Sequence, residues 1–213
     1  ALIHSQTRDQ SEFGLSAKYA ASFNNIDNTV LDSNFSNFLA SLFYKQEERY
    51  FDWKVTLNSE RNNYNWYGIK DNTFLDTVID NIQENQTYNY FNIVGEVDFL
   101  DSYIDKSTLS IAYFSDDFSS KEFLINLNTN FDLPIDFISR NLNNLKVNTS
   151  LEFLNGSFES DYQNQNEVNY SIFTASINPE YTTTFSGFAL KLGTKLFASF
   201  DSENSVNHFL IYP

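Results

Sequence analysis

The stretch that decides the fold is EFGLSAKYAASF, residues 12–23. Every second position in it is apolar: Phe13, Leu15, Ala17, Tyr19, Ala21 and Phe23. The positions between them are mostly polar or small. Successive side chains of a β-strand point to opposite faces of the sheet, so this period of two predicts a strand with one apolar face and one hydrated face.

The same alternation returns along the whole chain, for example at 51–58 and 145–153. With clusters of Asn, Asp, Ser and Gln taken as boundaries, it predicts about ten strands. We expect them at 12–24, 35–46, 50–67, 86–100, 107–115, 121–131, 144–155, 168–178, 185–200 and 205–213. Most exceed the usual length of a globular strand and match the roughly 9 to 11 residues that cross a bilayer when tilted. The pattern therefore favours an all-β fold, a transmembrane antiparallel up-and-down β-barrel.

The connections also alternate in length. Long polar segments at 25–34, 68–85 and 156–167 are separated by shorter ones near 46–49, 101–106 and 179–184. In outer-membrane barrels the long loops face outside and the short turns face the periplasm. We expect residues 1–11 to be a polar leader or periplasmic segment and residues 12–213 to form the barrel domain. We also expect that domain to be incomplete at its C-terminal end, because the final residues VNHFLIYP would leave an unpaired strand.

Composition excludes several kinds of chemistry. The 213 residues include 22 Phe and 13 Tyr but no Cys, so disulfides, zinc-thiolate sites and thiol catalysis are absent. Histidines are limited to His4 and His208, which leaves little material for a catalytic triad or a histidine metal site. The formal charge of -15 argues against nucleic acid as a partner. We expect no enzyme, no cofactor and no bound metal, and outer-membrane lipid as the main partner, with other outer-membrane or periplasmic proteins as further candidates.

Charged and amide side chains identify the face that meets water. A lysine in the middle of a lipid-facing strand would cost roughly 2 to 4 kcal/mol. Lys191 and Lys195 alternate with leucines, so they select the side of their strand that faces the barrel lumen. The residues predicted to line the lumen are Asn92, Glu96, Asn126, Asn128, Asn148, Glu152, Lys191 and Lys195.

Aromatic residues gather near the predicted strand ends. Amphipathic rings favour the boundary between lipid and water, where the ring is apolar and its hydroxyl or indole nitrogen stays hydrated. The residues predicted to lie at this interface are Tyr44, Tyr50, Tyr64, Trp66 and Tyr67.

Short segments resemble a family of outer-membrane β-barrel proteins of Bacteroidota, loosely labelled TonB-dependent receptor-like. They are NYNWYG at 63–68, HFLIYP at 208–213, LDSNF at 31–35, LNGSF at 154–158 and LKLGTKLF at 190–197. The resemblance implies architecture and location, namely a transmembrane barrel in the bacterial outer membrane. A receptor coupled to TonB would also present a plug domain and a coupling box, and neither is recognisable in residues 1–213.

Three functions remain open at this stage. The first is a channel or ligand-uptake barrel, motivated by the polar lumen face. The second is a non-transporting accessory or scaffold subunit of an outer-membrane protein complex. The third is a soluble carbohydrate-binding β-sandwich that uses exposed rings such as those of Trp53 and Trp66, because sandwich strands alternate as well.

Overall fold

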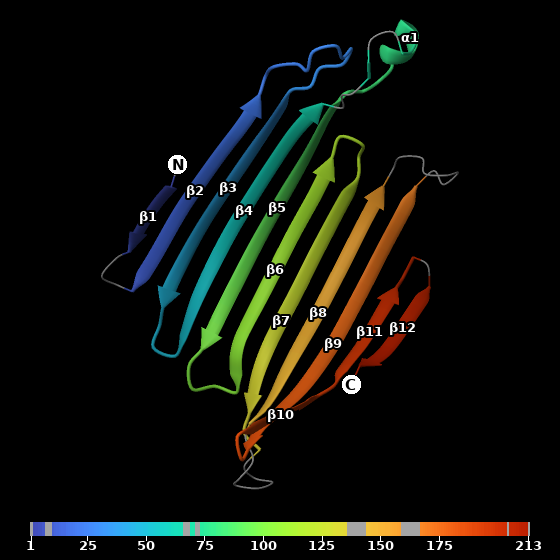
Figure 1. The fold of residues 1–213 in the computed structure, drawn as a ribbon. Coiled ribbons are helices and arrows are strands. Elements are labelled where there is room, and N and C mark those ends of the chain that lie inside the picture. The colour runs from blue at the N-terminus through green and yellow to red at the C-terminus, as the bar shows by residue number, and fades with distance from the viewer. Residues whose placement is uncertain are drawn as a thin grey trace.

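The computed structural model describes residues 2–6, 10–65, 69–70, 73–135, 144–158, 167–203 and 205–212. These residues form one antiparallel sheet of twelve strands and a short helix (Figure 1). The strands are β1 (Leu2–Gln6), β2 (Ser11–Ser22), β3 (Phe35–Glu47), β4 (Phe51–Asn65), β5 (Asn85–Phe99), β6 (Ile104–Asp116), β7 (Lys121–Leu133), β8 (Leu145–Phe158), β9 (Val168–Phe185), β10 (Phe188–Gly193), β11 (Lys195–Asp201) and β12 (Val206–Tyr212). The helix α1 (Asp76–Ile79) lies in the connection between β4 and β5.

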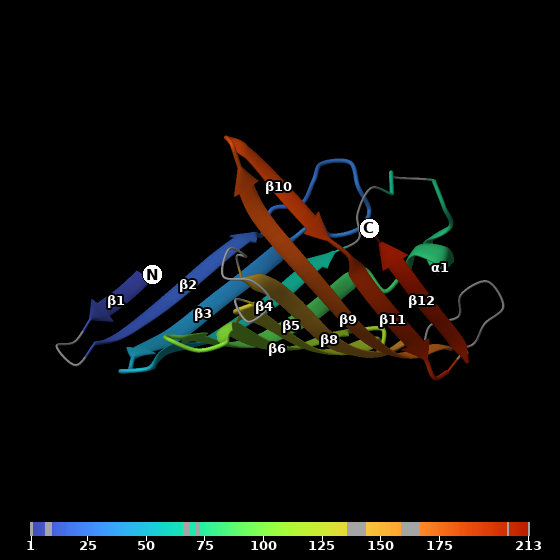
Figure 2. The same cartoon turned by 90° about the horizontal axis from the view of Figure 1, so that it is seen from below.

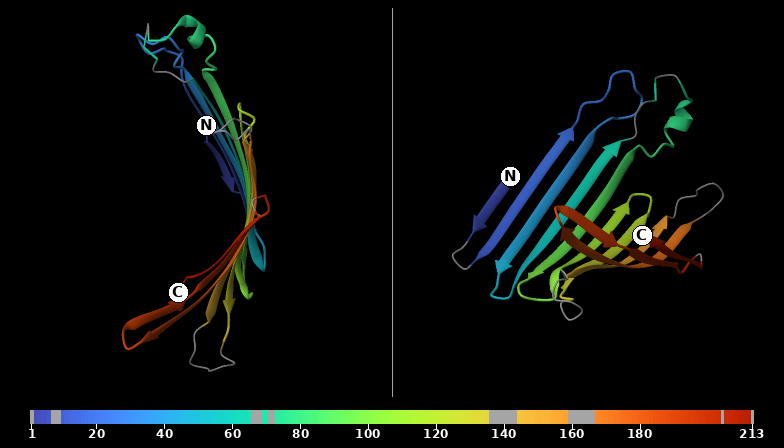
Figure 3. Two further views of the ribbon diagram at one scale, coloured as in Figure 1. Left: turned by 90° about the vertical axis from the view of Figure 1, so that its right-hand side faces the viewer. Right: turned by 60° about the horizontal axis from the view of Figure 1, so that its bottom comes forward.

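Neighbours in the chain are neighbours in the sheet. The order runs from β1 to β9 and continues through β11 to β12, while β10 also pairs with β9. This confirms the expectation of an all-β, antiparallel, up-and-down sheet. The sheet curves into a trough and is open, because among the described strands β1 pairs only with β2 and β12 only with β11 (Figures 2 and 3).

Within residues 1–11, expected as a leader before the sheet, residues 2–6 form the edge strand β1. β1 pairs with β2 from Leu2 opposite Ser16 to Gln6 opposite Glu12. Its pairing places Ile3 beside Leu15. Its sequence LIHSQ does not alternate, because Leu2 and Ile3 are adjacent and three polar residues follow, so only the pairing with β2 reveals this strand.

The region 185–200, expected as one strand, is divided into β10 and β11 at Thr194. Pro179 of β9 lies opposite this break, and Thr194 N–H donates to its carbonyl at 3.2 Å. A proline has no N–H to return, so the ladder is interrupted there. The turn expected at 179–184 lies instead at Ser186 and Gly187, which both have positive φ, as a two-residue hairpin turn requires.

The trough has a concave face and a convex face, and alternate residues of each strand belong to opposite faces. Among the described residues, the buried apolar side chains are only Leu31, Ala112 and Val147, because a single layer encloses no interior. Connections at one end of the strands include 23–34, 73–84 and 117–120, which we call the loop end. Those at the other end include 48–50, 100–103 and 186–187, which we call the turn end.

Candidate functional site on the concave face

A continuous row of polar side chains crosses the concave face at mid-height. Each member lies on the strand next to the one before it and in register with it, except that the row moves from Asn92 of β5 diagonally to Ser110 of β6. We call this row the polar belt: Ser16, Ser41, Asn58, Asn92, Ser110, Asn126, Glu152, Thr174, Ser199 and His208. A water-filled trough would be lined by this belt from β2 to β12.

Asn92 is the best-connected residue of the polar belt. The residue is 9% exposed, and its side-chain oxygen accepts a hydrogen bond from Asn58 Nδ2 at 3.3 Å. Its own Nδ2 donates to Ser110 Oγ at 3.0 Å, and Ser41 Oγ donates to Asn58 Oδ1 at 2.8 Å. The amides therefore satisfy one another across four strands, β3 to β6, which fixes their orientation.

The second half of the belt contains a carboxylate. Asn126 Nδ2 donates to Glu152 Oε2 at 2.9 Å, and Asn128 Nδ2 donates to Asn126 Oδ1. Further along, the hydroxyls of Thr174 and Ser199 are 3.3 Å apart. This arrangement presents hydrogen-bond donors and acceptors together with negative charge, and suits hydrated cations or neutral polar solutes.

Every residue predicted to line the lumen lies on the concave face. Asn92, Asn126 and Glu152 belong to the polar belt, and Asn128 and Asn148 lie on the same face nearer the turn end. Glu96, Lys191 and Lys195 lie on this face too, as their pairing partners show. Sequence reasoning missed Asn58, His208 and the serines and threonine that complete the belt. Small hydroxyl residues occur on both faces, and only the register assigns them.

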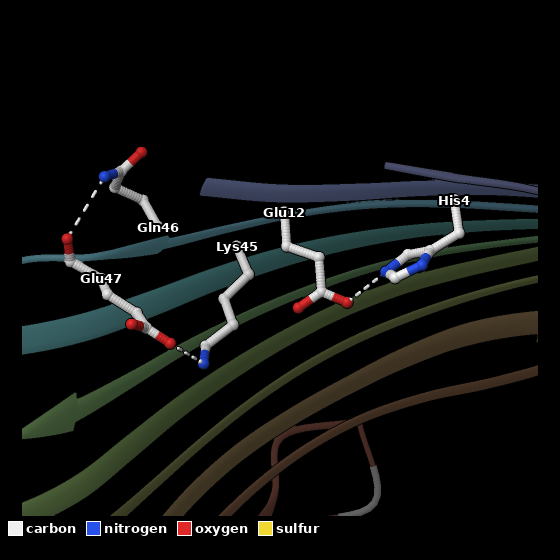
Figure 4. Close-up of polar contacts among 5 residues, drawn as sticks. All are labelled: His4, Glu12, Lys45, Gln46 and Glu47. Atoms are coloured by element: carbon white, nitrogen blue, oxygen red, sulfur yellow. Dashed lines mark hydrogen bonds and ion pairs between the residues drawn. The ribbon is translucent and has the colours of Figure 1, made fainter. Parts of the chain in front are cut away.

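Charges on the concave face concentrate toward the turn end and are mostly paired. Lys45 Nζ lies 2.8 Å from Glu47 Oε1, and the Glu12 carboxylate is hydrogen-bonded to His4, with Nε2 at 2.5 Å from Oε1 (Figure 4). Figure 4 also shows Gln46 pointing to the other side of the sheet, as alternation requires. Two further pairs are Lys191 with Glu180 at 2.8 Å and Lys106 with Glu96 at 3.6 Å.

A hollow of about 540 Å³ lies between the belt and the loop end on β2 to β5. Its lining includes Lys18, Leu39, Glu60 and Tyr90, which occupy one register row of the concave face. Glu60 Oε1 accepts hydrogen bonds from Tyr88 Oη at 3.0 Å and from Asn37 Nδ2 at 3.3 Å. The hollow thus combines a cation, an anchored carboxylate and an aromatic ring.

Two glycines of the concave face make room for aromatic rings. The Tyr170 ring lies over Gly156, and its hydroxyl donates to Glu122 Oε2 at 2.5 Å, two strands away. In the same way the Phe43 ring lies over Gly14. A Cβ at either glycine would come within 2.3 Å of the ring, so both positions depend on the missing side chain.

The convex face carries an apolar row directly behind the polar belt. We call it the apolar belt: Ile3, Leu15, Leu42, Leu57, Ile93, Ile111, Ile125, Phe153, Phe173 and Phe200. These side chains remain partly or largely exposed; Leu42, for example, is 42% exposed. The two belts are one residue apart in each strand from β2 to β11.

The predicted interface aromatics fall in different environments. Tyr44 lies on the convex face near the turn end and packs against Trp53 with ring centroids 5.3 Å apart. Tyr50 is 61% exposed in the β3–β4 turn. Tyr64 lies on the concave face, which does not fit a position facing lipid. Trp66 and Tyr67 lie outside the described residues.

Two connections at the loop end contact each other. Val30 N–H donates to the Ile69 carbonyl at 3.1 Å, and Thr29 and Lys70 form an isolated β-bridge. Asp32 N–H donates to Glu84 Oε2 at 3.1 Å, and Leu31 is 7% exposed between these segments. The described parts of the connections that follow β2 and β4 therefore form one surface at the loop end.

Comparison of the chain with protein-family models, curated proteins and solved structures gives no match. In the described part of the chain, no group of three or more His, Cys, Asp or Glu side chains is arranged to hold a metal ion. No described helix is long and apolar enough to cross a membrane.

Proposed function

We propose that the chain forms the wall, or part of the wall, of a bacterial outer-membrane β-barrel that acts as a channel or ligand-uptake protein. The observation that carries this proposal is the unequal division of charge between the two faces. Among the paired residues of the described strands, the charged side chains of the convex face are Arg61 and Lys121, both close to the loop end. Those of the concave face include Lys18, Lys45, Lys54, Glu60, Glu96, Asp98, Lys106, Glu122, Asp132, Lys146, Glu152, Glu180, Lys191 and Lys195.

A bilayer supplies the physical reason for this division. A lysine or arginine at the bilayer midplane of a barrel's outer surface costs about 2 to 4 kcal/mol, and much less near either interface. A protein surrounded by water gains nothing from an exposed row of Leu, Ile and Phe across ten strands, which would promote aggregation.

Strand length supports the same environment. Apolar side chains of the convex face extend over 91–99 in β5, 145–153 in β8 and 173–181 in β9, interrupted by single small or hydroxyl residues. These stretches match the roughly 9 to 11 residues that a tilted strand needs to cross the hydrocarbon core. A carbohydrate-binding sandwich would need two stacked sheets, whereas the described strands form one.

The proposal is tested by measuring the conductance of a planar bilayer that contains the full-length protein, purified in detergent. We expect discrete channels whose selectivity for cations falls in Glu152→Lys, because this change reverses a charge of the polar belt. Glu203→Lys, in the connection between β11 and β12, is the matched control and should change selectivity less. A protein that stays soluble without detergent would contradict the membrane environment itself.

The free sheet edges favour a second candidate, an accessory or scaffold subunit of an outer-membrane complex. Each unpaired backbone group in hydrocarbon costs several kcal/mol, so the open edges of β1 and β12 need partner strands inside a bilayer. Co-purification from detergent separates the candidates. A silent barrel that elutes with defined partner proteins supports the subunit, and a conducting barrel that elutes without them supports the channel.

A further inference from the structure

A single register row marks the boundary of the apolar convex face at the loop end. It crosses β2 to β9, and we call it the boundary row: Tyr19, Phe38, Arg61, Asn89, Ser115, Lys121, Ser157 and Asn169. From Arg61 onward every member is polar. The next row toward the apolar belt already includes Phe91, Tyr113 and Phe123.

The cations of the boundary row differ from three lysines of the concave face. Lys45, Lys106 and Lys191 each lie beside a carboxylate. Arg61 and Lys121 are exposed and have no ion pair among the described residues. An unpaired cation next to a wide apolar surface is complementary to an anion that is itself attached to an apolar group.

Resting on the proposed function, we infer that the boundary row binds the phosphate groups of lipid headgroups in the leaflet at the loop end. Arg61 and Lys121 stand three strands apart, or roughly 14 Å at the usual strand spacing. Each therefore contacts its own phosphate. The side chains of Asn89 and Ser115 lie between them in the row and donate further N–H and O–H hydrogen bonds.

The chemistry of the row favours phosphate on a lipid over other anions. A guanidinium binds phosphate oxygens through two parallel hydrogen bonds, and an ammonium binds them as a point charge. The net charge of -15 disfavours attraction of a free anion from a distance. An anchored headgroup needs no such attraction, because its acyl chains already lie against the apolar belt.

The test measures lipid retention by native mass spectrometry of the full chain in detergent, with phosphatidic acid and phosphatidylcholine as probes. We expect the protein to retain phosphatidic acid preferentially. Arg61→Gln combined with Lys121→Gln should weaken that retention by roughly 10- to 30-fold, at about 1 kcal/mol for each cation near an anionic surface. Lys18→Gln combined with Lys54→Gln removes the same charge from the concave face and should leave retention unchanged.

Three outcomes would overturn the inference. The first is equal retention of phosphatidic acid by the protein and the boundary-row variant. The second is equal loss in the two double variants, which would indicate an effect of net charge alone. The third is displacement of phosphatidic acid by inorganic phosphate at similar concentration, which would indicate a site for the free anion. Flotation with phosphatidylcholine vesicles keeps the two proposals separate: a chain that floats without preferring phosphatidic acid contradicts this inference only, and a chain that does not float contradicts both.

Discussion

Adjacent residues that lie on the concave and convex faces of this sheet differ in exposure and in hydrogen bonding. Asn92 is 9% exposed and hydrogen-bonded to the side chains of Asn58 and Ser110, whereas the next residue, Ile93, is 39% exposed. In a soluble protein the polar residue would usually be the exposed one and the apolar residue the buried one. Because the inner surface of a curved sheet brings side chains together and the outer surface separates them, the curvature crowds the polar groups and leaves the apolar ones open.

This difference shows that side chains on the two faces find their interaction partners in different places. Concave polar groups bind one another, so their geometry is set by the chain alone. Convex apolar groups have few partners in the chain, so their stability depends on what surrounds them. Substitutions on the two faces should therefore respond differently, even when they are neighbours in the sequence.

Introducing a lysine on each face should give the largest difference in the free energy of unfolding. Leu151 is 45% exposed on the convex face, and Ser150 is its neighbour on the concave face. In a bilayer, Leu151→Lys should lower the free energy of unfolding by about 2 to 4 kcal/mol, and Ser150→Lys by less than about 1 kcal/mol. Urea titration of the full chain folded into phosphatidylcholine vesicles measures both values. Equal effects would mean that lipid does not contact the convex face.

Removal of an amide from the polar belt should have the next largest effect. Asn92→Leu removes the acceptor of Asn58 Nδ2 and the donor to Ser110 Oγ in a crowded environment, which should cost about 1 to 3 kcal/mol. Asn130→Leu should cost less, because Asn130 is also on the concave face but its side chain makes no hydrogen bond among the described residues. The same titration compares the two variants, and a larger loss for Asn130→Leu would refute the role of the belt in stability.

Adding a methyl group to each face tests the crowding directly. In Gly156→Ala the new Cβ would meet the Tyr170 ring at 2.3 Å, so the ring must move away from Glu122. We expect a loss of about 1 to 3 kcal/mol. In Gly95→Ala, on the convex face, the nearest atom is the Leu109 carbonyl oxygen at 4.0 Å, so stability should change by less than about 0.5 kcal/mol. Equal losses would show that both faces are crowded.

The sequence predicted most of this fold because alternation is a local signal. The strand expected at 121–131 is observed at Lys121–Leu133, and the one at 168–178 begins at the observed residue. The same alternation predicts which face each side chain belongs to. It assigns Lys191 and Lys195 to the same face as Asn92, although it predicts one strand where the structure has β10 and β11.

The features that the sequence pattern does not predict depend on contacts between strands. β1 is visible only through its pairing with β2, and the break at Thr194 only through Pro179, which is distant in the chain. The polar belt could not be predicted as a row, because its members align only once every register is known. A hairpin turn such as Ser186–Gly187 sets the register of its two strands, so counting residues outward from each turn would align the members of the polar belt.

Removal of an ion pair on the concave face should lower the free energy of unfolding least. Lys191 Nζ lies 2.8 Å from Glu180 Oε2, but the lysine side chain is 67% exposed and well solvated. Exposed pairs contribute about 0.2 to 1 kcal/mol and are screened by salt, so Lys191→Gln should lower stability by less than about 1 kcal/mol, and by less still at high ionic strength. Lys195→Gln removes an equal charge from the same face, at a residue without an ion pair among the described ones. The difference between these variants at low and high salt isolates the pair from the general field. A loss in Lys191→Gln that exceeded the loss in Leu151→Lys would reverse the comparison, because charge pairing inside the trough would then outweigh the apolar exterior.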